Sequence, residues 1–372
     1  MDENIKSEPQ RSEKIPRFTI VVFILTALTA ILHFISSSSA AFSDFFNANI
    51  SSIVRFILAK ITNWLPFSLA EVLFILIPVI FICVLRYAIK NRSSSYKAVG
   101  IYCLEILSFV CCFYILFFWA YGVGYGTTPL EKKLNLDTEN ITADELLSTA
   151  IWLAEEANEA AGDVRYDKSG FSVIPYGYDK MSENIIDAYN KYTESNNYLS
   201  RLDSRIKPIM LSEAMAYTHI SGVYTFFTGE ANVNTAFPSY TIPFTAAHEF
   251  AHQRGIAPED EANFVSFDVL RGSEDFYLRY SAYLNMLEYV LDALYRANPQ
   301  KYALALSYVD KNVAGEMKAY SSFFKKYEGS AAGSVSEAIN DTFLKLNGTE
   351  GSVSYGLVVR LAAGLHRSIK EE

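Results

Sequence analysis

The chain has 372 residues, of which 51% are hydrophobic and 15% aromatic, and its formal net charge is −9. The acidic surplus lies in residues 123–372, and an acidic domain argues against nucleic acid as a partner. All four cysteines precede residue 113, so the later part of the chain has neither disulfides nor cysteine ligands for a metal.

The hydrophobic residues gather in three stretches, 18–36, 66–89 and 99–121, and each is long enough to span a bilayer, which takes about 20 apolar residues. No comparable stretch follows. The sequence therefore predicts a membrane domain over residues 1–126 with three transmembrane helices in contact with lipid, and a water-facing domain over residues 127–372. Between the first two stretches, residues 45–65 predict an amphipathic helix, on the outer membrane face or packed on the spans.

Basic residues predict the orientation of these spans. The loop between the second and third stretches holds Arg86, Lys90, Arg92 and Lys97 and no acid, and the N-terminal tail is also rich in Lys and Arg. Positive loops remain in the cytoplasm, so the N-terminus is expected inside and the C-terminal domain outside the cytoplasmic membrane. A cleaved signal peptide, with small residues at 37–41, is the alternative, and it also places the domain outside.

The water-facing domain is predicted to be mainly α-helical. Amphipathic patterns cover residues 143–162, 273–298, 311–326, 333–346 and 355–369, the first of them after the capping residue Thr142. Residues 219–244, rich in Thr, Val, Phe and Tyr, predict a strand or short hairpin. A small sheet element would then lead directly into the helix that follows it.

That next helix contains the sequence HEFAH at residues 248–252. One helical turn separates His248 from His252, so both imidazoles lie on one face and can bind one tetrahedral Zn²⁺. Glu249 stands where a carboxylate can take a proton from a water bound to that ion. The alternative is a solvated helix face with two unrelated histidines.

A catalytic zinc needs a third protein ligand and one open position. Gly255 is expected to end the histidine helix, and Pro258 to open another. The first turn of this second helix carries Glu259, Asp260 and Glu261. Because the connection is short, one of these acids must return to within reach of the metal, although acids at this position also complement the helix dipole.

The segment EDEAN (259–263) resembles the E-x-x-A-D element of zinc peptidases related to the CAAX prenyl proteases and the heat-shock membrane proteases. There the glutamate binds zinc and the acid four residues later bonds to a ligand histidine. The resemblance implies that Glu259 is the third ligand, with Glu261 as the alternative. It also implies that Asn263 does not bind the metal itself but forms a hydrogen bond to a ligand histidine.

A longer resemblance covers GEANVNTAFPSYTIPFTAAHEFAHQRGIAPEDEANF (229–264), NDTFLKLNG (340–348) and SYGLVV (354–359). These segments resemble a bacterial membrane family known as the domain of unknown function number 3810. The resemblance implies several N-terminal spans followed by a zincin-like, mostly helical metallopeptidase domain in the bacterial inner membrane. It implies no particular substrate.

Two further parts of a peptidase site can be assigned candidates. An extended peptide would pair with a sheet edge beside the metal helix, and residues 229–235 are the candidate edge. A donor to the developing oxyanion is usually His, Tyr or Arg, and His219 and Tyr355 are the candidates.

The sequence thus predicts a membrane-anchored zinc metallopeptidase that hydrolyses peptides or proteins outside the cytoplasmic membrane. The alternative is a non-catalytic membrane sensor or scaffold with a structural or vestigial zinc site. Glu249 separates the two, because a structural site has no need of a base beside its first histidine. An intramembrane protease is disfavoured, because residues 245–267 carry more charge than a bilayer accepts.

Overall fold

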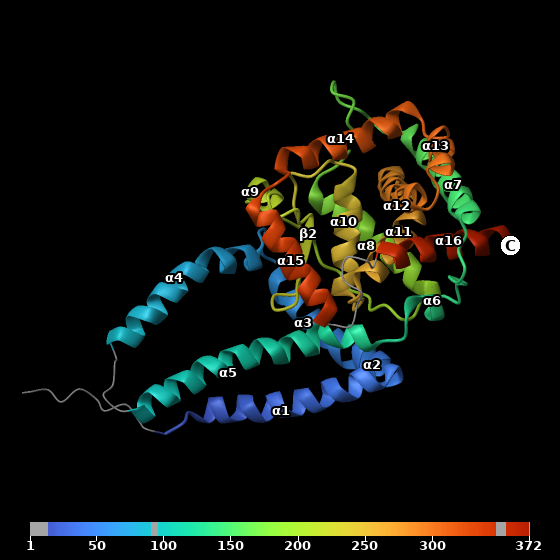
Figure 1. Ribbon diagram of the computed structural model, residues 1–372. Coiled ribbons are helices and arrows are strands. Elements are labelled where there is room, and N and C mark those ends of the chain that lie inside the picture. Colours follow the sequence, from blue (N-terminus) through green and yellow to red (C-terminus); the bar gives the residue numbers. More distant parts are fainter. Residues whose placement is uncertain (1–13, 91–95, 347–354, 372) are drawn as a thin grey trace, which may run out of the picture.

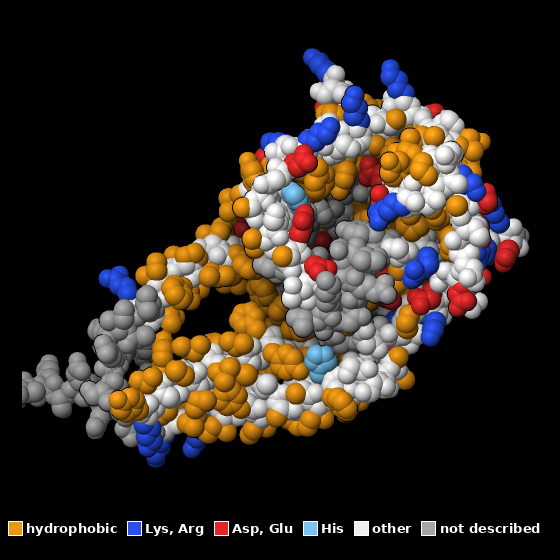
Figure 2. All heavy atoms as spheres, in the orientation of Figure 1, with side chains coloured by type: hydrophobic (Ala, Val, Ile, Leu, Met, Phe, Trp, Pro, Cys, Tyr) orange, Lys and Arg blue, Asp and Glu red, His pale blue; other side chains and the backbone are white. Residues whose placement is uncertain are grey.

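The computed structural model describes residues 14–90, 96–346 and 355–371. Figure 1 shows a rounded, mainly helical body from which three long helices extend to one side. These helices, called the arms below, are α1 (Arg17–Ser38), α4 (Leu69–Lys90) and α5 (Tyr96–Ala120). Figure 2 shows hydrophobic side chains along the length of the arms, whereas charged side chains gather on the body and at the far ends of the arms.

Two of the arms are long and apolar enough to cross a membrane. These are α1 and, within α5, residues Val99–Ala120, and they pack side by side. The predicted span 66–89 corresponds to α4, whose apolar part among the described residues, Leu69–Val84, is shorter than a full span. Only 17% of an 18-residue apolar stretch in each of these two helices is buried, which is unlike a helix in the core of a soluble protein.

The predicted amphipathic helix over 45–65 is present in three pieces: α2 (Ala40–Phe46), a π-helical turn η1 (Asn47–Ser51) and α3 (Ser52–Asn63). Several of its polar residues are buried against the body. Arg55 is fully buried and donates to Asn47 Oδ1 and to the carbonyl of Ala120, and the Thr62 hydroxyl donates to the carbonyl of Thr228. The parts of the sequence before and after residue 126 therefore share a buried polar interface.

The body contains the helices that the amphipathic patterns predict. Helix α7 (Ala143–Ala161) begins with a capping box, in which Thr142 and Glu145 satisfy each other's amides. The other predicted helices are α12 (Phe276–Ala297), α14 (Lys311–Tyr327), α15 (Ala331–Leu346) and α16 (Tyr355–Glu371). The remaining helices, which the patterns did not identify, are η2 (Gly122–Gly126), α6 (Leu130–Lys133), α8 (Tyr178–Ser195), α9 (Ser212–Ala216) and α13 (Pro299–Leu306).

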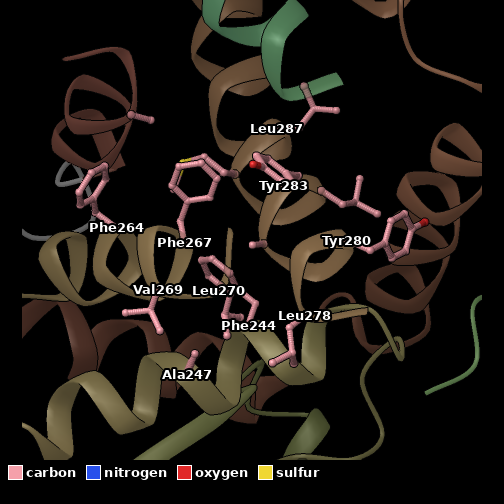
Figure 3. Close-up of a cluster of buried hydrophobic side chains, with 14 of the residues drawn as sticks. Phe244, Ala247, Phe264, Phe267, Val269, Leu270, Leu278, Tyr280, Tyr283 and Leu287 are labelled. Carbon is pink, nitrogen blue, oxygen red and sulfur yellow. The ribbon is translucent and has the colours of Figure 1, made fainter. Parts of the chain in front are cut away.

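The main core lies between α7, α12 and the two helices that carry the predicted metal residues, α10 (Thr241–Gln253) and α11 (Glu259–Arg271). Figure 3 shows side chains of α10, α11 and α12 meeting there: Phe244, Ala247, Phe264, Phe267, Val269, Leu270, Leu278, Tyr280, Tyr283 and Leu287. Packing on all sides leaves almost no part of α10 exposed. Polar groups on α10 must therefore find partners inside the protein.

A three-stranded sheet lies beside α10. Its strands are β1 (Lys207–Pro208), β2 (Gly222–Thr225) and β3 (Glu230–Val233), in the order β1-β3-β2. The predicted hairpin within 219–244 is β2 and β3, which pair antiparallel, while β1 pairs parallel with β3. The prediction that 229–235 forms the sheet edge is wrong, because β3 is the central strand. The edge strand beside α10 is β2.

A buried ion pair connects the sheet with the start of α4. Lys207 Nζ lies 2.7 Å from Glu230 Oε1, and both side chains are at most 2% exposed. The same ammonium donates to the carbonyls of Thr62 and Phe67, and Glu230 accepts the first amides of α4, from Leu69 and Ala70. Every group is satisfied, which is the condition under which a buried pair is tolerated.

Replacing Lys207 with Met is expected to lower the free energy of unfolding by about 3–5 kcal/mol, because the charge of Glu230 would stay buried without its partner. Thermal unfolding of the detergent-solubilised protein measures the change. Lys326→Met is the matched control, since its partner Glu213 is mostly exposed and the pair is screened by solvent. Equal melting temperatures for the two variants would contradict this role of Lys207.

Candidate metal centre

A tight turn brings α10 and α11 together. Gly255 adopts a φ of +105°, a left-handed conformation that side-chain-bearing residues rarely adopt, and α11 begins at Glu259 directly after Pro258. The turn is also held from outside, because Asn47 Nδ2 donates to the carbonyl of Gly255 over 2.9 Å. A Cβ at position 255 would collide with Arg55 and Asn47. The connection between α10 and α11 is therefore fixed both at Gly255 and at Pro258.

The turn places Glu259 against the two histidines. His248 Nε2 lies 3.1 Å from Glu259 Oε2, and His252 Nε2 lies 3.5 Å from Glu259 Oε1. One ligand atom from each of the three residues lies within 4.8 Å of the others. Ligand atoms bound tetrahedrally at 2.0–2.1 Å from zinc are about 3.3 Å apart, which agrees with both distances. We call these three residues the trio.

The outer nitrogen of each histidine is already engaged. His252 Nδ1 lies 2.7 Å from the carbonyl oxygen of Ile256, which can only accept, so this nitrogen carries the hydrogen. His248 Nδ1 lies 2.9 Å from Asn263 Oδ1 and donates in the same way. A neutral imidazole with Nδ1–H has a lone pair on Nε2. Both lone pairs then face the carboxylate of Glu259, which is repulsive unless a proton or a metal cation lies between them.

The pKa values of His252 and Glu259 also indicate that positive charge is favoured within the trio. Burial lowers the pKa of His252, but the carboxylate of Glu259 outweighs it and raises that pKa to about 9. Burial alone would raise the pKa of Glu259, yet the two histidines hold it well below its ordinary value. A proton on His252 meets this demand in part, and a divalent ion in the centre of the trio would meet it fully.

Glu249 is buried beside the trio, and burial raises its pKa to about 7 against the opposing effect of the two histidines. The backbone of Tyr224 on β2 provides a hydrogen bond to it. Space for the carboxylate is provided by Gly222, because a Cβ there would come within 2.5 Å of Glu249 Oε1. The edge strand and the base candidate thus fit each other closely.

A cavity of about 990 Å³ adjoins the trio. Its walls come from α10, α11, the edge strand β2, and the helices α12, α14, α15 and α16, and it also contains Phe117 and Tyr121 from the end of the α5 arm. Glu249 and all three members of the trio line it. The cavity leaves room for a ligand directly beside the trio.

The other predicted site residues lie at varying distances from this centre. Glu261 is not in the trio: its Oε1 accepts the amide of Leu130 over 3.0 Å, and burial raises its pKa to about 7. His219 lines the cavity with a φ of +61°, and its ring nitrogens face Glu337 Oε1 and the carbonyl of Tyr327. Tyr355 begins α16, but its side chain lies outside the described residues.

One residue at the centre was not predicted. Tyr121 directly follows the α5 arm, and its hydroxyl lies 3.3 Å from His252 Nδ1 and donates to the carbonyl of Ala257 over 3.0 Å. It is buried. The sequence offers an aromatic at a span end, which is typical of a membrane interface, and nothing that connects this aromatic to a histidine 131 positions later. Only the folded chain brings the two together.

Replacing Asn263 with Ala is expected to lower zinc affinity about 10–100-fold, because His248 would lose the partner that fixes its ring and tautomer. Competition with a chromogenic chelator measures the affinity. Asn263→Asp is the matched control, since a carboxylate accepts the same hydrogen bond and is expected to preserve binding. An unchanged affinity in Asn263→Ala would mean that this contact does not orient the ring.

The model of the protein family of unknown function DUF3810 matches residues 42–363. The chain belongs to that family. No curated protein and no solved structure matches the sequence.

Proposed function

We propose that the chain is a membrane-anchored zinc metallopeptidase that hydrolyses peptide bonds just outside the cytoplasmic membrane. The observation that carries the proposal is the convergence of two Nε2 atoms and one carboxylate on a single point, with both Nδ1 atoms already donating elsewhere. Zinc bound there would polarise the scissile carbonyl and make an attacking water more acidic.

The remaining chemistry belongs to the protein. Glu249 would accept a proton from the attacking water, and the water oxygen would form a bond to the carbonyl carbon. The carbon–nitrogen bond then breaks, and Glu249 would return the proton to the leaving amine, giving one carboxylate and one amine. Uptake and later return of one proton by the same carboxylate is general base followed by general acid catalysis.

The membrane location is supported by the arms. α1 runs from its start at Arg17 toward the body, α4 runs away from the body, and α5 returns to it, so the start of α1, the end of α4 and the start of α5 lie at the same far end. Lys and Arg side chains gather at that end in Figure 2. With α4 as the third span, the positive-inside rule places this end in the cytoplasm and the body outside.

A non-catalytic sensor or scaffold with a structural zinc is the second candidate. It explains the trio but not Glu249, a carboxylate that is 4% exposed and for which Gly222 leaves space. Burying a carboxylate lowers the stability of the protein, and a purely structural zinc site gains nothing from a buried carboxylate that does not bind the metal.

The proposal is tested on the full chain in detergent or lipid vesicles. We expect about one zinc per chain by metal analysis, cleavage of a mixed-sequence quenched peptide library, and loss of cleavage with 1,10-phenanthroline that is restored by added zinc. A zinc-loaded protein that cleaves no peptide would favour the second candidate.

A further inference from the structure

One wall of the cavity is formed by the end of α5, which is one of the two arms that are apolar enough to cross a membrane. The apolar part of α5 ends at Ala120, and the next residue, Tyr121, has its ring centroid 5.5 Å from that of His252. Phe117, one helical turn earlier, lines the same cavity as the trio. The metal centre therefore lies at the level where the apolar stretch ends, and not at a distance from it.

A continuous row of aromatic rings connects this wall with the space between α4 and α5. Phe117 contacts Phe226, and Phe226 contacts Phe227 at the β2–β3 turn. Phe227 in turn lies against Phe74 of α4 and Phe113 of α5, at centroid distances of 6.1 and 5.9 Å. Because Phe113 precedes the end of α5 by seven residues, this contact lies about 10 Å along the arm. The turn thus reaches a depth at which the arms are apolar.

An opening lies between these two arms beyond this point. Figure 1 shows α4 leaving the body at an angle to α5, and Figure 2 shows an opening between them with hydrophobic side chains on both sides. Phe74 and Phe113, at the body end of the opening, each keep 55% of their surface exposed. In a bilayer, an opening of this kind is filled by lipid chains or by an apolar segment of another protein.

The geometry points to substrates that are membrane-anchored polypeptides, cut within a few residues of the point where they leave the bilayer. The anchor would occupy the opening between α4 and α5. This inference rests on the proposed peptidase activity. The chain emerging past Phe226 would meet β2 at Thr225, the end of the edge strand, and could pair along it toward Gly222 and Glu249. An extended chain covers the 10 Å from Phe113 to the end of the arm in about three residues.

Position relative to the anchor is the property to measure. The full chain, loaded with zinc, is reconstituted in phosphatidylethanolamine–phosphatidylglycerol vesicles with reporters that carry one apolar transmembrane segment. A mixed-sequence quenched peptide follows that segment after a spacer of either about 4 or about 20 residues. The anchor and its surface density are then identical, so enrichment at the membrane cannot cause a difference. We expect the short-spacer reporter to be cleaved at least ten-fold faster, with product masses that place the cut near the anchor.

A variant pair tests the opening itself. Phe227 contacts both arms but does not line the cavity. Phe227→Asp is expected to lower cleavage of the short-spacer reporter at least ten-fold while zinc content and cleavage of the soluble library stay unchanged, and Phe227→Leu is expected to behave as the unaltered protein. The soluble library also serves as the check on folding.

The outcomes separate the two proposals. Equal cleavage of both spacers, or cuts far from the anchor, would overturn the inference and leave the peptidase activity standing. Equal rates in Phe227→Asp and Phe227→Leu would show that the opening holds only lipid, and would also overturn it. Zinc-loaded protein that cleaves neither the soluble library nor any reporter would overturn the proposed function and the inference with it.

Discussion

Replacing Glu249 with Gln is expected to lower peptide turnover about 10²–10⁴-fold while zinc content stays unchanged. Gln has the same shape and keeps an oxygen for the hydrogen bond from the backbone of Tyr224, but it cannot take a proton from water. General-base catalysis contributes a factor of this size. The measurement is the initial rate of library cleavage by the full chain in vesicles, with metal analysis of the same samples.

Glu261→Gln is the matched control for this prediction. Glu261 is also buried and its pKa is also raised to about 7 by burial, but its carboxylate faces the amide of Leu130 and not the trio. We expect this variant to retain turnover and zinc, since the amide oxygen of Gln accepts the same hydrogen bond. If Glu249→Gln kept full activity, Glu249 would not be the base.

Replacing Glu259 with Gln is the second change from which we expect a large effect. The expected effect is loss of the bound zinc. The carboxylate supplies the only negative charge of the trio, and both histidines face it with Nε2. A neutral amide is a much poorer zinc ligand than a carboxylate. We expect an affinity loss larger than the 10–100-fold that removal of an outer partner causes, together with loss of turnover.

Two controls accompany Glu259→Gln. His248→Ala is expected to lose zinc in the same way, whereas Asp260→Asn, on the adjacent residue that also lines the cavity, is expected to keep it. Chelator competition gives the affinities. Stoichiometric zinc in Glu259→Gln would exclude Glu259 as a ligand and reopen the choice of the third one.

Helices α10 and α11 and the turn between them were predictable because local rules determine them. HExxH fixes the phase of α10, and Gly255 and Pro258 force the return. The choice between Glu259 and Glu261 follows from the phase of α11: each residue turns the helix by about 100°, so a glutamate two positions on points to nearly the opposite side. Asn263, four positions after Glu259, returns to the same face and meets His248.

Contacts between distant parts of the chain were not predictable. The stripe over 45–65 predicts a helix on the outer membrane face or packed on the spans, although Asn47 and Arg55 on it face the turn at Gly255. The central position of β3 depends on parallel pairing with β1, a two-residue strand too short to show any alternation. In both cases the deciding partners lie far apart in sequence and leave no periodic signal.

The contact from Asn47 to the carbonyl of Gly255 spans 208 positions and has a consequence for biogenesis. Ribosomes deliver the N-terminal helices first. The turn between α10 and α11 thus closes on helices that have already been synthesised. A nascent chain in which these helices were misplaced would lack the Asn47 contact, so the geometry of the trio would be completed only after the arms have taken their place.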